Sequence, residues 1–195
     1  MKKYLLLVVF ILVSISLFSQ EKEKKFTIQT NPALILFDLF SSSFSEDDYT
    51  MLSMDLEAQY KINNSVNLSL DLLFLLYRDT SYGEKFFQIS AKPMFIWRPF
   101  RTGLSGFFVG FYPDIGIISF ENKEENGLLT EIGFGFSIGY KWVFDKGFTL
   151  QLGSKFGRSF ILPEEPDNFD FYADTKIIFR ILALDLIEFK IGYSF

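Results

Sequence analysis

Residues 128–144 read LLTEIGFGFSIGYKWVF, and their side chains change character at every second position. One set is mostly large and apolar, and the set between is mostly small or polar. The first set is Leu128, Thr130, Ile132, Phe134, Phe136, Ile138, Tyr140, Trp142 and Phe144. Successive side chains of a β-strand point to opposite faces, so this stretch predicts a strand with one apolar and one small or polar face. A tight-turn sequence, Asp145-Lys146-Gly147, and a second alternating stretch at 148–157 follow, which predicts a β-hairpin.

The same alternation extends in both directions from this hairpin. It occurs at residues 26–37, 51–62, 66–77, 86–97 and 107–118, and again at the end of the chain, 187–195, where the sequence is IEFKIGYSF. Together with the hairpin these segments predict eight strands. Long polar links, such as 41–48 and 121–126, take turns with short ones, such as 63–65. An even number of apolar-out strands of ~10 residues, with long loops at one end and short turns at the other, is typical of outer-membrane barrels.

We therefore predict an all-β, eight-stranded antiparallel up-and-down transmembrane β-barrel with lipid outside and a polar lumen inside. The alternative is a soluble lipocalin-like barrel or a sandwich whose apolar set points inward, and periodicity alone does not decide between them. Glycines on the polar face favour the membrane barrel, as do aromatic residues near strand ends that resemble interfacial girdles. Those aromatic residues are Tyr60, Trp97, Tyr140, Trp142 and Tyr193.

The beginning of the chain also favours an exported protein. Lys2 and Lys3 precede an apolar run from Tyr4 to Phe18, and Ser19 ends the run. A permanent membrane anchor would need ~20 apolar residues, and this run is shorter. We predict a signal peptide over residues 1–19, a barrel domain over 20–195, and localisation in a bacterial outer membrane.

Composition excludes several functional classes. Removing Lys2 and Lys3 from 19 basic residues leaves 17 against 24 acidic ones, so nucleic-acid binding is not expected. The chain has no cysteine, which excludes disulfides, thiol chemistry and a lipoprotein cysteine. It also has no histidine, the usual general base of barrel hydrolases. We therefore expect no enzyme activity and no cofactor.

The acidic loop at residues 121–126 is a candidate site for calcium binding. Glu121, Glu124 and Glu125 could supply carboxylate ligands. An acidic loop is more often simply solvated, so we expect no metal site there.

The predicted inward face carries acids and lysines in near balance. Its acids are Asp55, Glu57, Asp71, Asp114, Glu131 and Glu188, and its lysines are Lys92, Lys141, Lys155 and Lys190. If the turn at 63–65 centres one hairpin, Glu57 lies beside Asp71, and the next hairpin places Asp71 beside Lys92. We predict a lumen network of ion pairs. Its members are Glu57, Asp71, Lys92, Asp114, Glu131, Lys141 and Lys155.

This network suits a sealed barrel better than a channel, because eight strands leave an interior just wide enough for side chains to fill. We therefore expect a structural or surface-interaction role. The alternative is a narrow conduit for small or hydrophobic solutes, in which Pro93 and Pro113 mark local breaks of the hydrogen-bond ladder. The simpler interpretation of these two prolines is that they lie at bulges.

The last residues and the hairpin resemble a known group of proteins. IGYSF at 191–195 resembles the aromatic-ending final strand that the barrel-assembly machinery recognises, with Tyr193 and Phe195 as its signal. The stretch 135–157 resembles the penultimate hairpin of small barrels related to the OmpA membrane domain and to OmpW-like proteins, including an uncharacterised Bacteroidetes family. Thr30-Asn31-Pro32 is similar to that family's first strand. The resemblance implies architecture and location but no activity. We expect outer-membrane lipid and the barrel-assembly machinery as partners, and a monomer.

Residues 169–195 are too many for one crossing of ~9–11 residues. Residues 171–182 form either an extension above the membrane or part of one very long last strand, and the sequence leaves both alternatives open.

Overall fold

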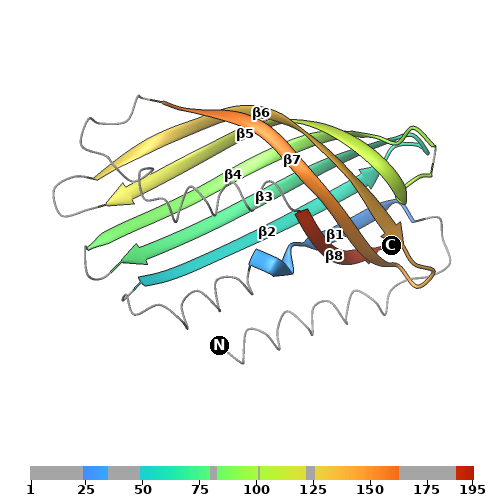
Figure 1. Ribbon diagram of the computed structural model, residues 1–195, viewed down its shortest axis with the longest axis horizontal. Helices are drawn as coiled ribbons and strands as arrows, with labels where there is room; N and C mark the ends of the chain where they lie inside the picture. The colour runs from blue at the N-terminus through green and yellow to red at the C-terminus, as the bar shows by residue number, and fades with distance from the viewer. Residues whose placement is uncertain (1–23, 35–48, 80–82, 101, 122–125, 163–187) are drawn as a thin grey trace.

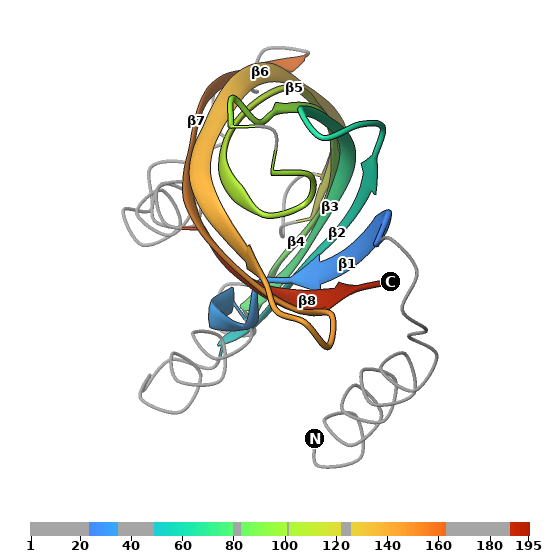
Figure 2. The same ribbon diagram turned by 90° about the vertical axis from the view of Figure 1, so that its right-hand side faces the viewer.

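The computed structural model describes residues 24–34, 49–79, 83–100, 102–121, 126–162 and 188–195. Within them eight antiparallel strands form a closed barrel in which each strand pairs with the next and β8 returns to β1 (Figures 1 and 2). The strands are β1 (Phe26–Thr30), β2 (Tyr49–Lys61), β3 (Val66–Asp79), β4 (Glu84–Trp97), β5 (Gly106–Glu121), β6 (Asn126–Val143), β7 (Phe148–Leu162) and β8 (Glu188–Ser194). The predicted fold class and strand count are confirmed as an all-β, eight-stranded antiparallel barrel.

The two faces of the wall differ as the alternation predicts. Large apolar side chains such as Leu70, Phe111 and Phe136 are exposed on the outside, and the polar residues between them are buried inside. The alternative in which the large apolar set points inward does not describe this barrel. Of the five expected girdle residues, all but Tyr193 are well exposed on the outer face.

The lumen is less uniformly polar than the alternation predicts. One buried cluster of seven apolar side chains fills its loop end: Met51, Leu75, Tyr77, Phe86, Ile118, Phe120 and Leu129. A second apolar cluster, of Met94, Ile96, Phe108 and Tyr112, lines part of the opposite half. The buried charges lie between and beside these two clusters, so apolar as well as charged side chains occupy the lumen.

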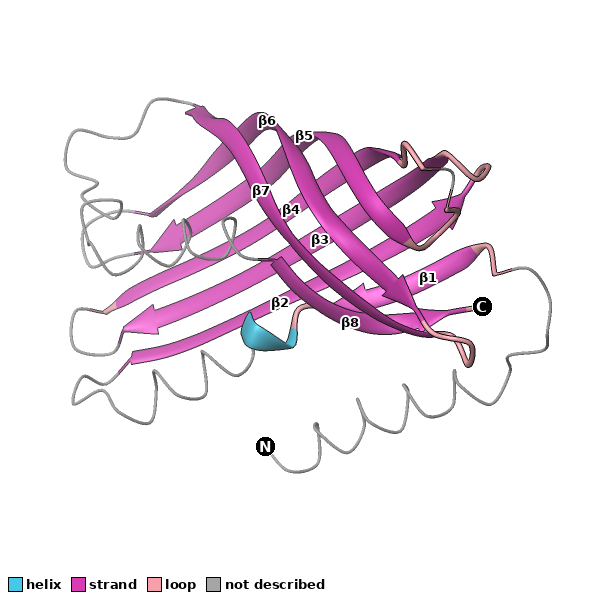
Figure 3. Ribbon diagram, turned by 45° about the vertical axis from the view of Figure 1, so that its right-hand side comes forward, coloured by secondary structure: helices cyan, strands magenta, loops and turns pink. Residues whose placement is uncertain are grey.

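The first strand is shorter than predicted. β1 ends at Thr30, and a short helical turn at 32–34 follows (Figure 3). The Asn31 side chain accepts a hydrogen bond from the Ala33 amide at 3.1 Å, and Pro32 has the fixed φ that suits a first helical residue. The alternation of residues 26–37 predicts that Leu34 and Leu36 face outward, but Leu34 is only 2% exposed, and Leu36 lies outside the described residues.

The two mid-strand prolines lie opposite one another. The register of β4 and β5 pairs Ala91 with Ile115 and resumes at Phe95 with Phe111, and three residues on each strand lie unpaired between. Because no residue is inserted on either strand, the bulge interpretation is wrong. The prolines instead mark a local interruption of the ladder, as expected for residues that have no N–H to donate.

The short turns close one end of the barrel. Gly147 has a φ of 94°, which the Asp145-Lys146-Gly147 turn requires and which side-chain-bearing residues rarely adopt. The link between β4 and β5 folds over the mouth of the lumen (Figure 2), where Leu104 is buried. We call residues 98–100 and 102–106 the cap. The predicted signal peptide, the loop 41–48 and the segment 169–186 lie outside the described residues.

Candidate functional site

Both register pairs predicted from the turns are confirmed. Glu57 on β2 lies opposite Asp71 on β3, and Asp71 lies opposite Lys92 on β4. All three side chains point into the lumen and are buried. Two carboxylates therefore lie side by side in a confined interior, where each needs a cation or hydrogen-bond donors in place of water.

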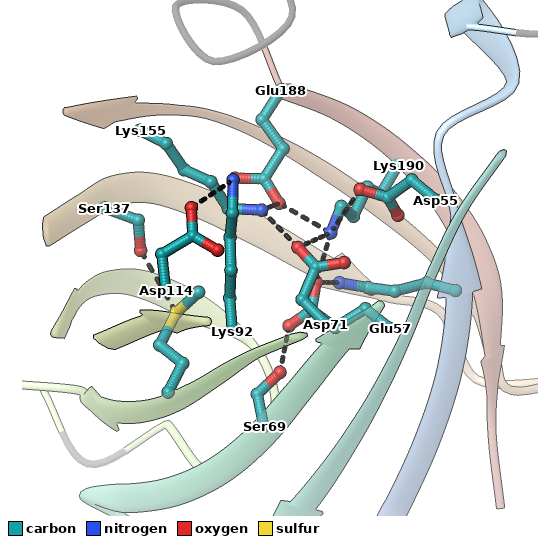
Figure 4. Close-up of polar contacts among 12 residues, drawn as sticks. Asp55, Glu57, Ser69, Asp71, Lys92, Asp114, Ser137, Lys155, Glu188 and Lys190 are labelled. Carbon is teal, nitrogen blue, oxygen red and sulfur yellow. Dashed lines mark hydrogen bonds and ion pairs between the residues drawn. The ribbon is translucent and has the colours of Figure 1, made fainter. Parts of the chain in front are cut away.

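The cation at the centre of the lumen is Lys190 of β8. Its Nζ lies 2.8 Å from Glu57 Oε2 and 2.8 Å from Asp71 Oδ2. It lies 3.1 Å from Glu188 Oε1 and 3.2 Å from Asp55 Oδ2 (Figure 4). Lys190 is fully buried. One ammonium group thus holds four carboxylates, and its surroundings contain more negative than positive charge.

Lys155 of β7 supplies a second ammonium group to this cluster. Its Nζ contacts Asp71 Oδ2 and lies 3.5 Å from Glu188 Oε1. β7 and β3 are not neighbours in the wall, so this contact crosses the lumen. Side chains from opposite walls meet, as expected for an eight-stranded barrel. We call Asp55, Glu57, Asp71, Glu188, Lys155 and Lys190 the central cluster.

Neutral donors complete the hydrogen bonding of Glu57. Gln29 Nε2 donates to Glu57 Oε2 at 2.8 Å, while Gln59 Nε2, at 2.7 Å, and the Ser69 hydroxyl donate to Oε1. Gln151 Nε2 donates to Glu188 Oε1 at 3.1 Å. Glu57 therefore has partners on both oxygens, which stabilises a buried carboxylate.

The ammonium of Lys92 has a different role from the one predicted. We expected it to neutralise Glu57 and Asp71, but Lys190 and Lys155 do so. Lys92 Nζ instead lies 3.3 Å from Asp114 Oδ2. Lys92 and Asp114 flank the two opposed prolines on β4 and β5, so their ion pair joins the strands where the ladder is interrupted. The register places Lys92 between Asp71 on β3 and Asp114 on β5, and its ion pair forms with Asp114.

Two further members of the predicted network form no ion pair within the described part of the chain. Glu131 accepts a hydrogen bond from Gln88 Nε2 at 2.6 Å and is only partly buried. Lys141 is fully buried and donates to Gln59 Oε1 at 2.7 Å. Glu131 therefore lies outside the ion-pair network, while Lys141 joins it only through the Gln59 amide.

Arg98, the first residue of the cap, is not among the residues predicted for the lumen. Its side chain is fully buried, its Nη1 donates to the Gly106 carbonyl at 2.9 Å, and its guanidinium lies 5.3 Å from the centre of the Phe108 ring. Burial lowers the pKa of Arg98 to about 10, which leaves it charged at neutral pH. The alternation could have predicted its position, because one step past the outward-facing Trp97 places the side chain of residue 98 inside.

Three carboxylates of the central cluster lie close enough together to bind a metal ion. Glu57, Asp71 and Glu188 can each offer an oxygen, and these oxygens lie within 4.8 Å of one another. The Lys190 ammonium already contacts all three, so it takes the position of a cation. On the loop side, Glu121 pairs with Lys85 at 2.9 Å, and Glu124 and Glu125 lie outside the described residues.

The two residues of the expected assembly signal lie at the seam between β1 and β8. The Phe195 carbonyl accepts hydrogen bonds from the Lys25 and Phe26 amides, at 3.1 and 3.0 Å, and the Phe195 ring packs 5.3 Å from that of Phe26. Phe195 is 42% exposed on the outer face. Tyr193, expected to face lipid, is largely buried, because the turn at Gly147 lies against its ring.

Comparisons with protein-family models, with curated proteins and with solved structures find no match. No helix among the described residues is long and apolar enough to cross a membrane.

Proposed function

We propose that this protein is a small outer-membrane β-barrel with a structural or surface-interaction role, whose lumen is sealed by side chains. The observation that carries the proposal is the central cluster, which joins β2, β3, β7 and β8 across the lumen beneath a wall of exposed apolar residues. Charges paired with one another inside and apolar groups outside suit a molecule whose solvent is lipid.

The residues at the two ends of the strands also support a barrel that lies in a membrane. Trp97, Tyr140 and Trp142 surround the end with short turns, and charged Lys85 and Glu121 lie on the outer surface near the other end. The 13 to 18 residues of β2 to β7 exceed the ~9–11 that cross a bilayer, so these strands would extend beyond it on the loop side. We propose a monomer, exported by a signal peptide and related in architecture to OmpA-like and OmpW-like barrels, with outer-membrane lipid and the assembly machinery as its partners. We propose no enzymatic activity.

The alternative function is a narrow conduit for small or hydrophobic solutes. The interrupted ladder at Pro93 and Pro113 favours it, since both prolines face outward. Directly inside lie the Lys92–Asp114 ion pair and the buried side chains of Met94 and Tyr112. A solute would have to displace these groups, so we favour the sealed barrel.

Conductance separates these two functions. The refolded protein in a planar bilayer should show no discrete openings at physiological salt, because ion pairs and apolar clusters fill its lumen. A large-pore porin reconstituted in the same way serves as the positive control. Reproducible unitary openings, or release of a small dye from vesicles that contain the protein, would support the conduit and contradict the sealed barrel.

The last residue offers a test of assembly. Replacing Phe195 by serine should strongly reduce the amount of folded barrel in the outer-membrane fraction and increase degraded or periplasmic material, because the terminal aromatic residue serves as the assembly signal. Phe100→Ser, at an even more exposed aromatic residue in the cap, is the matched control and should assemble normally. Equal membrane levels for the two variants would refute this role of Phe195.

A further inference from the structure

Two cations in the lumen have no carboxylate partner among the described residues. Arg98 of the cap and Lys141 of β6 are both fully buried, and neither forms an ion pair within the described part of the chain. Buried charges are normally paired, because an unpaired ion loses its hydration without compensation. This pair of cations is therefore unlike the central cluster, where every ammonium group contacts carboxylates.

The two cations belong to one site. Arg98 Nη1 is bound to the carbonyl oxygen of Gly106, and Gly106 is the register partner of Lys141. The two positive charges interact electrostatically. The Ser105 hydroxyl also donates to the Lys141 carbonyl at 3.1 Å, which ties the cap to β6 above the two side chains.

Unused donors of both side chains remain available. Nε and Nη2 of Arg98 are buried and have no hydrogen-bond partner among the described residues. These two atoms form one edge of the guanidinium, and this edge can donate hydrogen bonds to two oxygens of a carboxylate or phosphate at once. The Lys141 ammonium has three N–H donors and makes one hydrogen bond, to Gln59.

The nearby acid does not satisfy these donors. Glu57 interacts electrostatically with both cations. Its Oε1 is occupied by Gln59 and Ser69, and its Oε2 by Gln29 and Lys190. Both oxygens of Glu57 are thus committed to other donors.

We propose that Arg98 and Lys141 form a binding site for a small oxyanion, with two of its oxygens on the Nε–Nη2 edge of Arg98 and the Lys141 ammonium on one of these two or, in phosphate, on a third. A carboxylate such as formate and inorganic phosphate share this chemistry, and their sizes distinguish them. Two further lysines lie at the cap. Lys24 and Lys61 border an open cavity of about 370 Å³ whose wall includes cap residues 102–105.

The test is a titration of the refolded wild-type protein in detergent, in which the Arg98 Nε–H resonance is observed by NMR. Arg98→Lys assigns the signal. We expect formate to shift this resonance saturably, with a dissociation constant on the order of 1 mM, and chloride at equal ionic strength to have no such effect. If phosphate saturates the site at lower concentration than formate, the ligand is a phosphate; if phosphate has no effect, the site takes only small carboxylates. A linear shift of equal size with every salt, or no shift, would overturn the proposal.

Variants separate this site from general salt effects. Lys141→Met should weaken formate binding about tenfold or more, as expected on loss of a charged hydrogen bond. Lys146→Met removes an exposed lysine in the β6–β7 turn at the same end of the barrel and should leave binding unchanged. Equal affinities in these two variants would contradict the role of Lys141. If Lys141→Met does not fold, the wild-type titration decides.

Discussion

Replacing Lys190 by methionine is expected to lower the free energy of unfolding by about 3–5 kcal/mol, the usual effect of removing one partner from a buried ion pair. The reason is local. Methionine fills much of the same volume but leaves four carboxylates, including Asp55 and Glu188, with only Lys155 to neutralise them. The measurement is equilibrium unfolding by urea of the protein refolded in lipid vesicles.

A surface lysine provides the matched control. Lys85 pairs with Glu121 on the outside, where both side chains are about half exposed, so Lys85→Met should cost less than about 1 kcal/mol. Adding Asp55→Asn and Glu188→Gln to Lys190→Met should recover part of the loss, because two of the four negative charges around Lys155 disappear. A Lys190→Met variant as stable as Lys85→Met would mean that the central cluster does not hold the barrel together.

A charge on the outer face should have an effect of similar size. Leu70 is the fifth of the 14 residues of β3, inside the part of the strand that would cross the bilayer, and is 43% exposed. In a bilayer, Leu70→Arg should destabilise the barrel by about 2–4 kcal/mol, the cost of an arginine near the membrane midplane. In water the same change at an exposed position would stay within about 0.5 kcal/mol.

Leu70→Ala removes the same packing without adding charge, so the difference between the two variants isolates the cost of the charge. Urea unfolding from vesicles measures both. If Leu70→Arg is no less stable than Leu70→Ala, then this face of β3 is not in contact with lipid.

The barrel wall could be predicted from sequence because its rules are local. The alternation in residues 128–144 assigns each side chain to a face, and a turn as short as 63–65 sets the register of the strands on either side. These two rules were enough to place Glu57 opposite Asp71, and centring the next hairpin on its longer link placed Asp71 opposite Lys92.

The interior was harder to predict because its contacts cross between strands that are not neighbours. Lys155 and Lys190 reach Asp71 across the lumen, and no rule of register specifies that reach. Doublets such as Phe86-Phe87 and Phe107-Phe108 place aromatic rings on both faces, which concealed the apolar clusters of the lumen. Asn31 and Pro32 shortened β1 through a local turn that competes with the strand.

The claim that the exposed apolar face contacts lipid can be tested with the two tryptophans of the chain. Trp97 and Trp142 are 47% and 37% exposed on the outer face, near the end with short turns. The refolded protein in vesicles of brominated phospholipid should therefore lose much of its tryptophan fluorescence, with the strongest quenching when the bromines lie close to the headgroups. Fluorescence unchanged by bromine at any depth, with the protein remaining monomeric and folded in water, would contradict a membrane barrel.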